Sequence, residues 1–431
     1  MKTNNLHTMK EDLLHYVWRL QRFDATDLYT TEGQPIRIQM IGEHNHHSGP
    51  DFTNARIEIG KTLWAGNVEM HLKASEWMRH QHQSDPAYDN VILHVVLDED
   101  EKISRQNGSR IPCLELKKRI SSKLSKVYQK FLYNEYWIPC QHHFYEVGNM
   151  TKVLWLDRLL VERLECKTIV IEKLLQENTN NWEATFYQIL ARNFGVKVNA
   201  EPFERLARTL PLAILGKHKN DLFQIEALLF GQSGLLEGDL KDEYPNRLKK
   251  EYQFLQKKYQ LTPMEKTNWK FLRMRPANFP TIRIAQFAQL VFQSVHLFSK
   301  ILAAKNVREI ENMFELKLSN YWQTHYVFDK DSVKRKKSLG KNAIHLFIIN
   351  TITPFLFLYG NRQSEESYKD RAFRLLEEVP AEKNNIITKW EELGMIPKSA
   401  YETQALLQLK NEYCGKMRCL ECSIGCGILK G

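Results

Sequence analysis

Six of the seven residues from Val91 to Leu97 are apolar, and only His94 interrupts the run. A short apolar run without alternation predicts a β-strand that is buried on both faces, rather than one at a half-exposed surface. A strand of this kind needs other elements packed on both sides of its sheet. The run therefore favours a mixed α/β domain around it.

The segments on either side of this run have the spacing of helices and strands. Residues 8–23 have helical spacing, 36–41, 52–59 and 63–73 have strand character, 75–83 has the pattern of a helix that begins at the N-cap Ser75, and 112–116 resembles a short strand. The order is α-β-β-β-α-β. It predicts that the mixed α/β domain covers residues 1–120.

Beyond residue 120 the apolar spacing becomes helical. Helices are expected at 154–175, 182–193, 203–215, 221–236 and 246–259. Residues 343–359 are apolar but include His345, Asn350 and Pro354, which favours a buried helix over a membrane span. The expected fold class is α+β, with an α-helical domain at 121–410 and a Cys-rich, metal-binding tail at 411–431.

Histidine is concentrated in the N-terminal part of the chain. Seven of the 15 histidines fall in one short stretch, at His44, His46, His47, His71, His80, His82 and His94. On the strand at 63–73, alternation places Asn67, Glu69, His71 and Lys73 on one face. A face this charged is expected to line a site, although edge strands also carry Lys and Glu to prevent aggregation.

Two acidic residues on neighbouring strands complete a recognisable pattern. Pro50-Asp51 precedes one strand and Glu69-Met70-His71 lies on the next. In the α-β-β-β-α-β order, these residues resemble the PD-(D/E)xK nuclease superfamily. The resemblance implies a restriction-endonuclease-like domain and a DNA nuclease, with Mg²⁺ or Mn²⁺ held by Asp51, Glu69 and the Met70 backbone carbonyl. Hard oxygen ligands suit these ions, which activate water for attack on phosphorus.

The chain departs from that superfamily at one motif position. The motif ends in Lys two residues after the acid, where this chain has His71. An imidazole is largely neutral near pH 7 but can orient or deprotonate a water molecule. Lys73, one pleat further along, is the other candidate for the water-orienting or charge-stabilising catalytic group.

The remaining histidines leave alternatives open. His80 and His82 are candidates for a supporting role around the metal, although two residues apart on a helix they face different directions. A helix that ends early would let His82 and Asp85 reach the site from a loop. A transition-metal hydrolase that uses His71, His80 or His82 with Asp51 is then possible. His94 fits a core histidine, and the histidines at 44, 46 and 47 fit phosphate contacts or a plain loop.

Four of the seven cysteines fall in the pattern Cys414-x4-Cys419-x2-Cys422-x3-Cys426. Four thiols in so short a segment, with glycines that permit tight turns, can hold one Zn²⁺ or an iron–sulfur cluster. The alternative is free thiols. Cys113, Cys140 and Cys166 fit isolated buried thiols.

The basic excess lies outside the N-terminal domain. The first 130 residues hold 18 basic and 17 acidic side chains, so nearly all of the net charge of +10 lies in the rest of the chain. This mild excess suits a polyanion or a solvated surface. Candidate nucleic-acid contacts are Arg273 and Arg275, in a stretch that mixes aromatic and basic residues, and the run Lys334, Arg335, Lys336 and Lys337. Their structural alternatives are helix capping and an exposed loop.

Several longer segments resemble one bacterial family, domain-of-unknown-function family 2851. They are Gly49–Phe52, Trp64–His71, Glu226–Gly231, Arg273–Pro280 and Tyr413–Gly425. The resemblance implies a bacterial cytoplasmic protein and brings no activity with it. The absence of an apolar segment at the N-terminus also favours the cytoplasm. Two functions are therefore weighed: a metal-dependent nuclease, and a non-catalytic nucleic-acid-binding or scaffold protein with a structural metal at its C-terminus.

Overall fold

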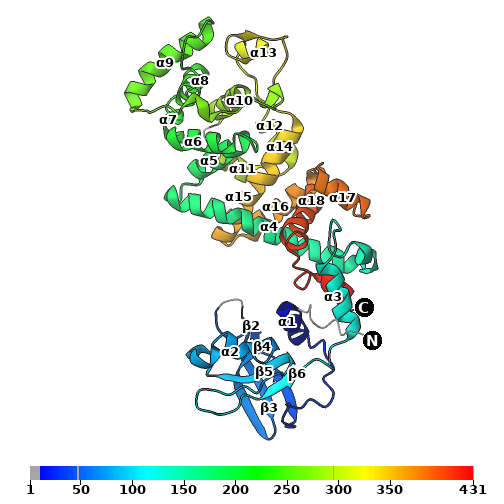
Figure 1. Cartoon of the computed structure of the whole chain (residues 1–431). Coiled ribbons are helices and arrows are strands. Elements are labelled where there is room, and N and C mark those ends of the chain that lie inside the picture. Colours follow the sequence, from blue (N-terminus) through cyan, green and yellow to red (C-terminus); the bar gives the residue numbers. More distant parts are fainter. Residues whose placement is uncertain (1–9, 46–47, 295, 431) are drawn as a thin grey trace. The chain divides into compact units, whose positions relative to one another are not determined.

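The computed structural model describes residues 10–45, 48–294 and 296–430 (Figure 1). The chain divides into two compact units, one formed by residues 1–155 with 409–431 and the other by 156–408. This grouping differs from the expected boundaries at 120 and 410. The C-terminal segment belongs to the same unit as the N-terminal sheet, because its helices pack on the segment that follows that sheet.

The first unit is built on a mixed sheet. Its strands are β1 (Ile36–Met40), β2 (Glu43–His44), β3 (Phe52–Ile59), β4 (Thr62–Lys73), β5 (Val91–Asp98) and β6 (Cys113–Glu115). The strand order is β1-β3-β4-β5-β6, and β2 pairs with β3. β3 is antiparallel to β1 and β4, whereas β5 is parallel to β4 and β6. Together with a larger helical part, this confirms the α+β class.

The strands form where the sequence predicts them. Gly60, at φ +65°, makes the tight turn of the β3–β4 hairpin. β5 lies between two parallel neighbours, and its first seven residues are all buried, as the apolar run predicts. Gly66 allows β4 to approach the start of β5, because a Cβ there would lie 2.5 Å from the Ile92 side chain.

Two short helices border the sheet. α1 (Glu11–Arg19) packs on β4 through an apolar stripe that includes Leu14, Val17 and Trp18. α2 (Glu76–Arg79) buries Trp77 in a core cluster with Val91 and other residues. Ser75 occupies the N-cap position of α2, but its hydroxyl donates to Asp100 instead of capping the helix.

The helix expected at 75–83 ends early. Gln81 has φ +61°, a left-handed conformation that stops the α-helix after Arg79, and the chain continues as the 3₁₀ turns η1 (His82–Ser84) and η2 (Pro86–Tyr88). This turn changes the directions of His80 and His82, which a continuous helix would hold on different faces.

The rest of the first unit is helical. It contains α3 (Ser122–Leu132), η3 (Gln141–Glu146), the first turns of α4 (Asn149–Glu177), η7 (Leu409–Cys414) and α19 (Ser423–Lys430). α19 packs on both α3 and η3. A hydrogen bond from the Arg19 side chain to the Leu420 carbonyl joins α1 to the C-terminal segment. Residues distant in sequence therefore meet in one unit.

The second unit contains the remaining elements. They are α5 (Trp182–Phe194), α6 (Ala200–Thr209), α7 (Leu212–Gly216), α8 (Leu222–Gln232), α9 (Glu243–Tyr259), η4 (Lys266–Asn268), η5 (Pro276–Asn278), α10 (Pro280–Gln293), α11 (Leu297–Ala303), α12 (Val307–Met313), α13 (Tyr321–Thr324), β7 (His325–Val327), β8 (Lys330–Asp331), α14 (Lys341–Phe347), η6 (Ile348–Ile352), α15 (Thr353–Gln363), α16 (Glu366–Glu378), α17 (Asn385–Glu392) and α18 (Ala400–Gln408). The predicted helix at 203–215 is two helices, because Pro211 separates α6 from α7.

Residues 341–363 form the one helix in the described chain that is long and apolar enough to cross a membrane. In its most apolar window, 72% is buried inside the protein. Core helices of soluble proteins have the same property. The structure therefore agrees with the predicted buried helix.

Candidate metal centre

A β-bulge sets the position of Asp51. Ala55 on β3 pairs with Gly66 on β4, and continuation of that register would place Asp51 opposite Met70. Instead the register shifts, and Phe52 pairs with Val68. Asn54, at φ +60°, takes the left-handed conformation that accompanies the shift. Asp51 therefore lies opposite Glu69.

Hydrogen bonds join Asp51 to Glu69 and to the amide of the next residue, Met70. The Asp51 amide donates to Glu69 Oε2 at 3.1 Å, and the Met70 amide donates to Asp51 Oδ2 at 2.9 Å. His15 Nε2, from α1, lies 3.3 Å from the same Asp51 oxygen. The structure thus brings together the two acids that the sequence singles out, at the strand positions expected for them.

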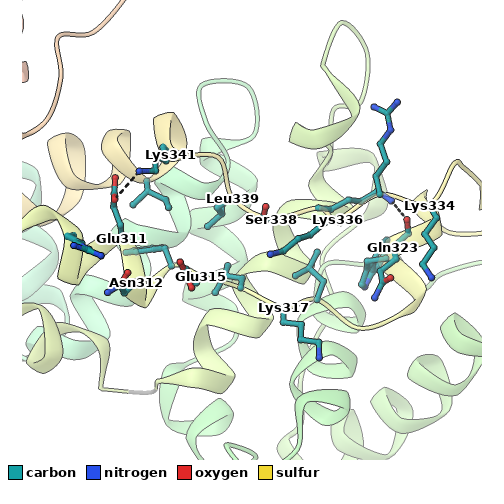
Figure 2. A pocket seen from close by; sticks show the side chains of 18 residues that line it. Glu311, Asn312, Glu315, Lys317, Gln323, Lys334, Lys336, Ser338, Leu339 and Lys341 are labelled. Carbon is teal, nitrogen blue, oxygen red and sulfur yellow. Dashed lines mark hydrogen bonds and ion pairs between the residues drawn. The ribbon is translucent and has the colours of Figure 1, made fainter.

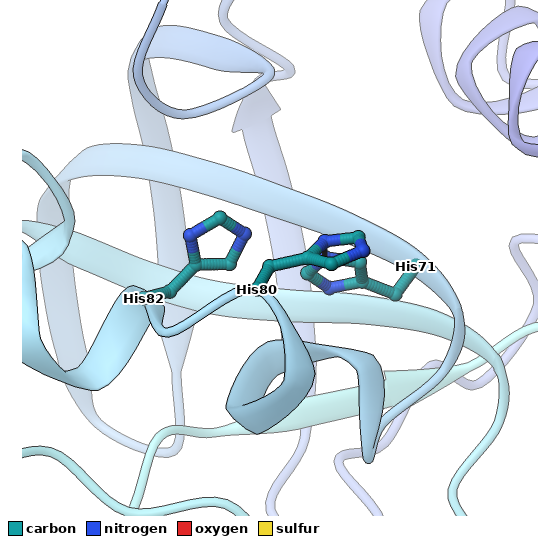
Figure 3. A group of neighbouring side chains, drawn as sticks. All are labelled: His71, His80 and His82. Atoms are coloured by element: carbon teal, nitrogen blue, oxygen red, sulfur yellow. Dashed lines mark hydrogen bonds between the residues drawn. The ribbon is translucent and has the colours of Figure 1, made fainter.

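Two imidazoles lie beside the other oxygen of Glu69, and a third lies beside one of them. His82 Nε2 lies 3.3 Å and His71 Nε2 lies 3.7 Å from Glu69 Oε1, while His71 Nε2 lies 3.2 Å from His80 Nδ1. One nitrogen from each of the three histidines lies within 4.8 Å of the others, and Figure 3 shows the rings close together. Among the described residues, this is the one set of His, Cys, Asp or Glu side chains that meets this distance.

These spacings match those of ligands around one metal ion. Two ligand atoms each about 2.1 Å from an ion are separated by roughly 3.0 to 3.4 Å in octahedral or tetrahedral geometry. The observed separations of 3.2, 3.3 and 3.7 Å lie at or just above this range. The three histidine nitrogens can therefore close on one ion with small side-chain movements, and Glu69 Oε1 lies beside two of the three rings.

Burial sets the charge of this cluster. Glu69 is 4% exposed. Burial and, less strongly, the negative charge of the neighbouring Asp51 raise the pKa of Glu69 to about 9. His71 is 1% exposed, and burial followed by repulsion from the other histidines lowers its pKa to about 2. Burial also lowers the pKa of His82. The imidazoles of His71 and His82 are thus neutral donors, which is the form that binds metals.

His94 extends the cluster toward the sheet. Its Nε2 lies 2.9 Å from His71 Nδ1, and burial lowers the pKa of His94 to about 3. His94 is a buried histidine, as the sequence predicts, but Nδ1 has no hydrogen-bond partner within the described part of the chain. Its role is to fix the ring of His71, so that Nε2 of His71 faces Glu69 and His80.

Two other predicted site residues lie differently from the pattern on the strand. Lys73 is at the exposed end of β4. Burial raises the pKa of Asp100, but hydrogen bonds to its carboxylate and, less strongly, the positive charge of Lys73 lower it overall. The cation that acts on Glu69 is His15. His44 stacks on Phe52, with 4.9 Å between ring centroids, whereas His46 and His47 lie outside the described residues.

Three contributors to the site were not predicted. Glu11 and His15 lie one turn apart on α1. Burial and, less strongly, the negative charge of Asp51 raise the pKa of Glu11 to about 7. Burial lowers the pKa of His15, but the hydrogen bond and ion pair with Asp51 raise it overall. The Tyr88 ring stacks on His82 at 3.8 Å. Glu11 and His15 are polar residues four positions apart beside the apolar stripe of α1, and this spacing is the sequence signal that could have identified them.

The cysteines form a second cluster in the same unit. Cys419 and Cys422 are buried, Cys414 and Cys426 are partly buried, and all seven cysteines of the chain are free thiols. Cys140 is not isolated, because it interacts electrostatically with Cys414, Cys419 and Cys422. Cys166 is exposed rather than buried, since it lies on the outer face of the long helix α4.

The predicted basic run lines a pocket of the second unit (Figure 2). This pocket, of about 870 Å³, is bordered by Arg308, Lys317, Lys334, Arg335, Lys336, Lys337 and Lys341, and by the acids Glu311 and Glu315. The residues 334–336 are exposed. Lys337 is buried and donates to the Gln323 carbonyl at 2.9 Å, so it holds the loop in place.

The other two predicted contacts, Arg273 and Arg275, are both exposed. Arg275 borders a second pocket of about 600 Å³, and Arg273 has φ +58°. Trp269, an aromatic residue of the same stretch, is 6% exposed, and its indole N–H donates to the Ser233 carbonyl. Trp269 is therefore a core residue and unable to stack on a base.

Comparison with protein families gives one match. Residues 11–385 match the family described as Protein of unknown function (DUF2851). The chain belongs to this family. The match to DUF2851 includes the sheet, the carboxylates and the histidine cluster, and the C-terminal cysteines lie beyond it. Neither the curated proteins nor the solved structures contain a match to this DUF2851 chain.

Proposed function

We propose that this DUF2851 protein is a metal-dependent phosphodiesterase that hydrolyses DNA. The observation that carries the proposal is the position of Glu69, with one carboxylate oxygen beside Asp51 and the other beside His71 and His82. Carboxylates and neutral imidazoles at ligand spacing are the donor set of hydrolytic metal sites.

The donor set favours manganese or another transition ion over magnesium. Mg²⁺ takes oxygen ligands and retains several waters, whereas imidazole nitrogen binds first-row transition ions better. Glu69, His71, His80 and His82 would hold the ion, with Asp51 and the Met70 carbonyl on the side of β3. When bound, the ion supplies a polarised water as nucleophile and neutralises charge on the phosphate.

The protein's own groups have separate tasks. His15 balances the charge of Asp51, and His94 fixes the ring of His71. His80 is the exposed member of the histidine set, so substrate and water would approach from its side.

The arrangement of strands supports this proposal. An antiparallel β3–β4 pair followed by a parallel β5, with acids on β3 and β4, agrees with the order that resembles PD-(D/E)xK nucleases. His71 occupies the place of the motif lysine and puts a neutral imidazole donor where the superfamily has a cation. The basic pocket of the second unit supports a phosphate-rich partner.

The test is cleavage of single- and double-stranded DNA with Mn²⁺ or Mg²⁺. Asp51→Asn and Glu69→Gln should each lower the rate at least about 100-fold, since changes around metal ligands cost 10- to 100-fold even when they are indirect. Glu58→Gln, on β3 but seven residues from Asp51, is the matched control and should cleave normally. Unchanged cleavage by both site variants would exclude this centre as the source of activity.

The basic pocket supports a second candidate, a non-catalytic nucleic-acid-binding protein. Its exposed residues 334–336 can contact phosphates without any metal. This function predicts salt-sensitive DNA binding that persists in EDTA and in Asp51→Asn, with no cleavage under any metal condition.

A further inference from the structure

One cysteine from outside the C-terminal segment, Cys140, lies near the C-terminal cysteines. Cys140 is the N-cap of η3 and is 7% exposed, as is Cys419, and Cys422 is 6% exposed. η3 packs directly on α19, the helix that follows Cys422. Buried thiols from segments about 275 residues apart thus lie on or beside elements that pack together.

The backbone around these thiols is held close. A Cβ on Gly425 would lie 2.3 Å from the Cys419 carbonyl oxygen, so only glycine lets α19 approach the Cys419 turn. Lys410, on η7, donates to the Trp137 carbonyl just before Cys140. The segments that carry Cys140, Cys414 and Cys419 are therefore fixed against one another.

The thiol environments separate Cys140 from Cys426. Cys140, Cys419 and Cys422 all repel the thiolate form of Cys414, and the Ile424 and Gly425 amides donate to the Cys422 sulfur. Cys426 also adjoins Cys419 and Cys422, but its thiol donates to the Leu420 carbonyl at 3.2 Å. The groups around its sulfur include Arg19, Lys430 and Tyr16.

We infer that Cys140, Cys414, Cys419 and Cys422 hold one iron–sulfur cluster and that Cys426 lies outside it. Four thiolates around one zinc ion would be about 3.8 Å apart, given Zn–S bonds near 2.3 Å. Within the described chain, no three of these sulfurs all lie within 4.8 Å of one another. A cluster, which places several irons between its thiolates, fits the wider spacing.

Cys140, Cys419 and Cys422 are buried, and Cys414 is partly buried. Amide hydrogen bonds to the Cys422 sulfur are the kind that stabilise a cluster thiolate. This inference concerns a site distinct from Glu69 and does not depend on nuclease activity.

The test compares matched Cys→Ser variants of the full chain, purified without oxygen. The wild type should contain iron and acid-labile sulfide in equal amounts and have broad visible absorption. Cys140→Ser should lose both the iron and the absorption, whereas Cys426→Ser and the control Cys113→Ser should keep them. Far-UV circular dichroism shows whether each variant is folded.

Alkylation of the wild type gives a test that is independent of variant folding. Mass spectrometry should find Cys140, Cys414, Cys419 and Cys422 protected from iodoacetamide until a chelator removes the iron, and then all four labelled. Zinc in place of iron in the wild type would overturn the inference. So would retention of the cluster by Cys140→Ser, its loss in Cys426→Ser, or labelling of Cys140 with the metal in place.

Discussion

Metal binding at the histidine cluster should release about one proton, and the proton should come from Glu69. The pKa of Glu69 is raised to about 9 by burial and by Asp51. At pH 7.5, which is below that value, the group is mainly protonated. A carboxyl group must lose its proton to bind a metal, whereas His71 and His82, whose pKa values are lowered, are already neutral.

The assay is calorimetric titration with Mn²⁺ in three buffers of different ionisation enthalpy. The slope of observed heat against ionisation enthalpy gives the number of protons released, and the expected value at pH 7.5 is about one. The apparent association constant should rise about tenfold per pH unit up to pH 9 and then level off. Glu69→Gln should abolish the release, and Glu58→Gln should leave it unchanged.

Two results would refute this reasoning. Tight binding without proton release would show that Glu69 is ionised before the metal arrives or that it is not a ligand. Equal release by wild type and Glu69→Gln would assign the proton to another group. In either case the proposed centre would lose its carboxylate.

Three further predictions concern stability and binding. Because the folded metal-free protein holds a proton on Glu69 that the unfolded chain releases above pH about 4.5, its stability to urea should fall as pH rises toward 9. Glu69→Gln should remove the part of this dependence above pH about 7, where Glu11, whose pKa is about 7, no longer contributes. Gly66→Ala should cost about 1–3 kcal/mol in urea unfolding because of the clash with β5, whereas Gly148→Ala, with nothing within 4 Å, should be nearly neutral. Replacing residues 334–336 by Ala should weaken the salt dependence of DNA binding. The slope of log affinity against log salt should fall by about one for each phosphate that the protein no longer neutralises. Lys337→Ala should instead lower stability, with less effect on that slope.

The sequence predicts the sheet well because its strands are defined by local pattern. The apolar run at 91–97 and the hairpin turn at Gly60 correspond to elements that the structure contains. The pairing of Asp51 with Glu69 also follows from neighbouring strands, although the bulge at Asn54 that secures it has no clear signal in the sequence. A one-residue change of register depends on cross-strand packing, which no local pattern encodes.

The parts of the sites that sequence reasoning missed come from distant segments. His15 approaches Asp51 only because α1 packs on β4, and Cys140 approaches the terminal thiols only because η3 packs on α19. The meeting of His80 and His82 depends on one left-handed residue, Gln81. Each is a tertiary effect that overrides the local spacing.

The buried cluster around Glu69 is costly without a cation. A carboxyl group and two imidazoles on the neighbouring strands β4 and β5 are almost completely buried: Glu69, His71 and His94 are 4%, 1% and 1% exposed. Burying polar groups with incomplete partners costs about 1–3 kcal/mol for each group, and the second nitrogen of His94 has none within the described residues. A protein that needed only a stable sheet would gain by placing apolar residues here, as it does at Val68 and Val95. A bound metal ion would reverse the balance for Glu69 and His71, because it would give their buried donor atoms a cation as a partner.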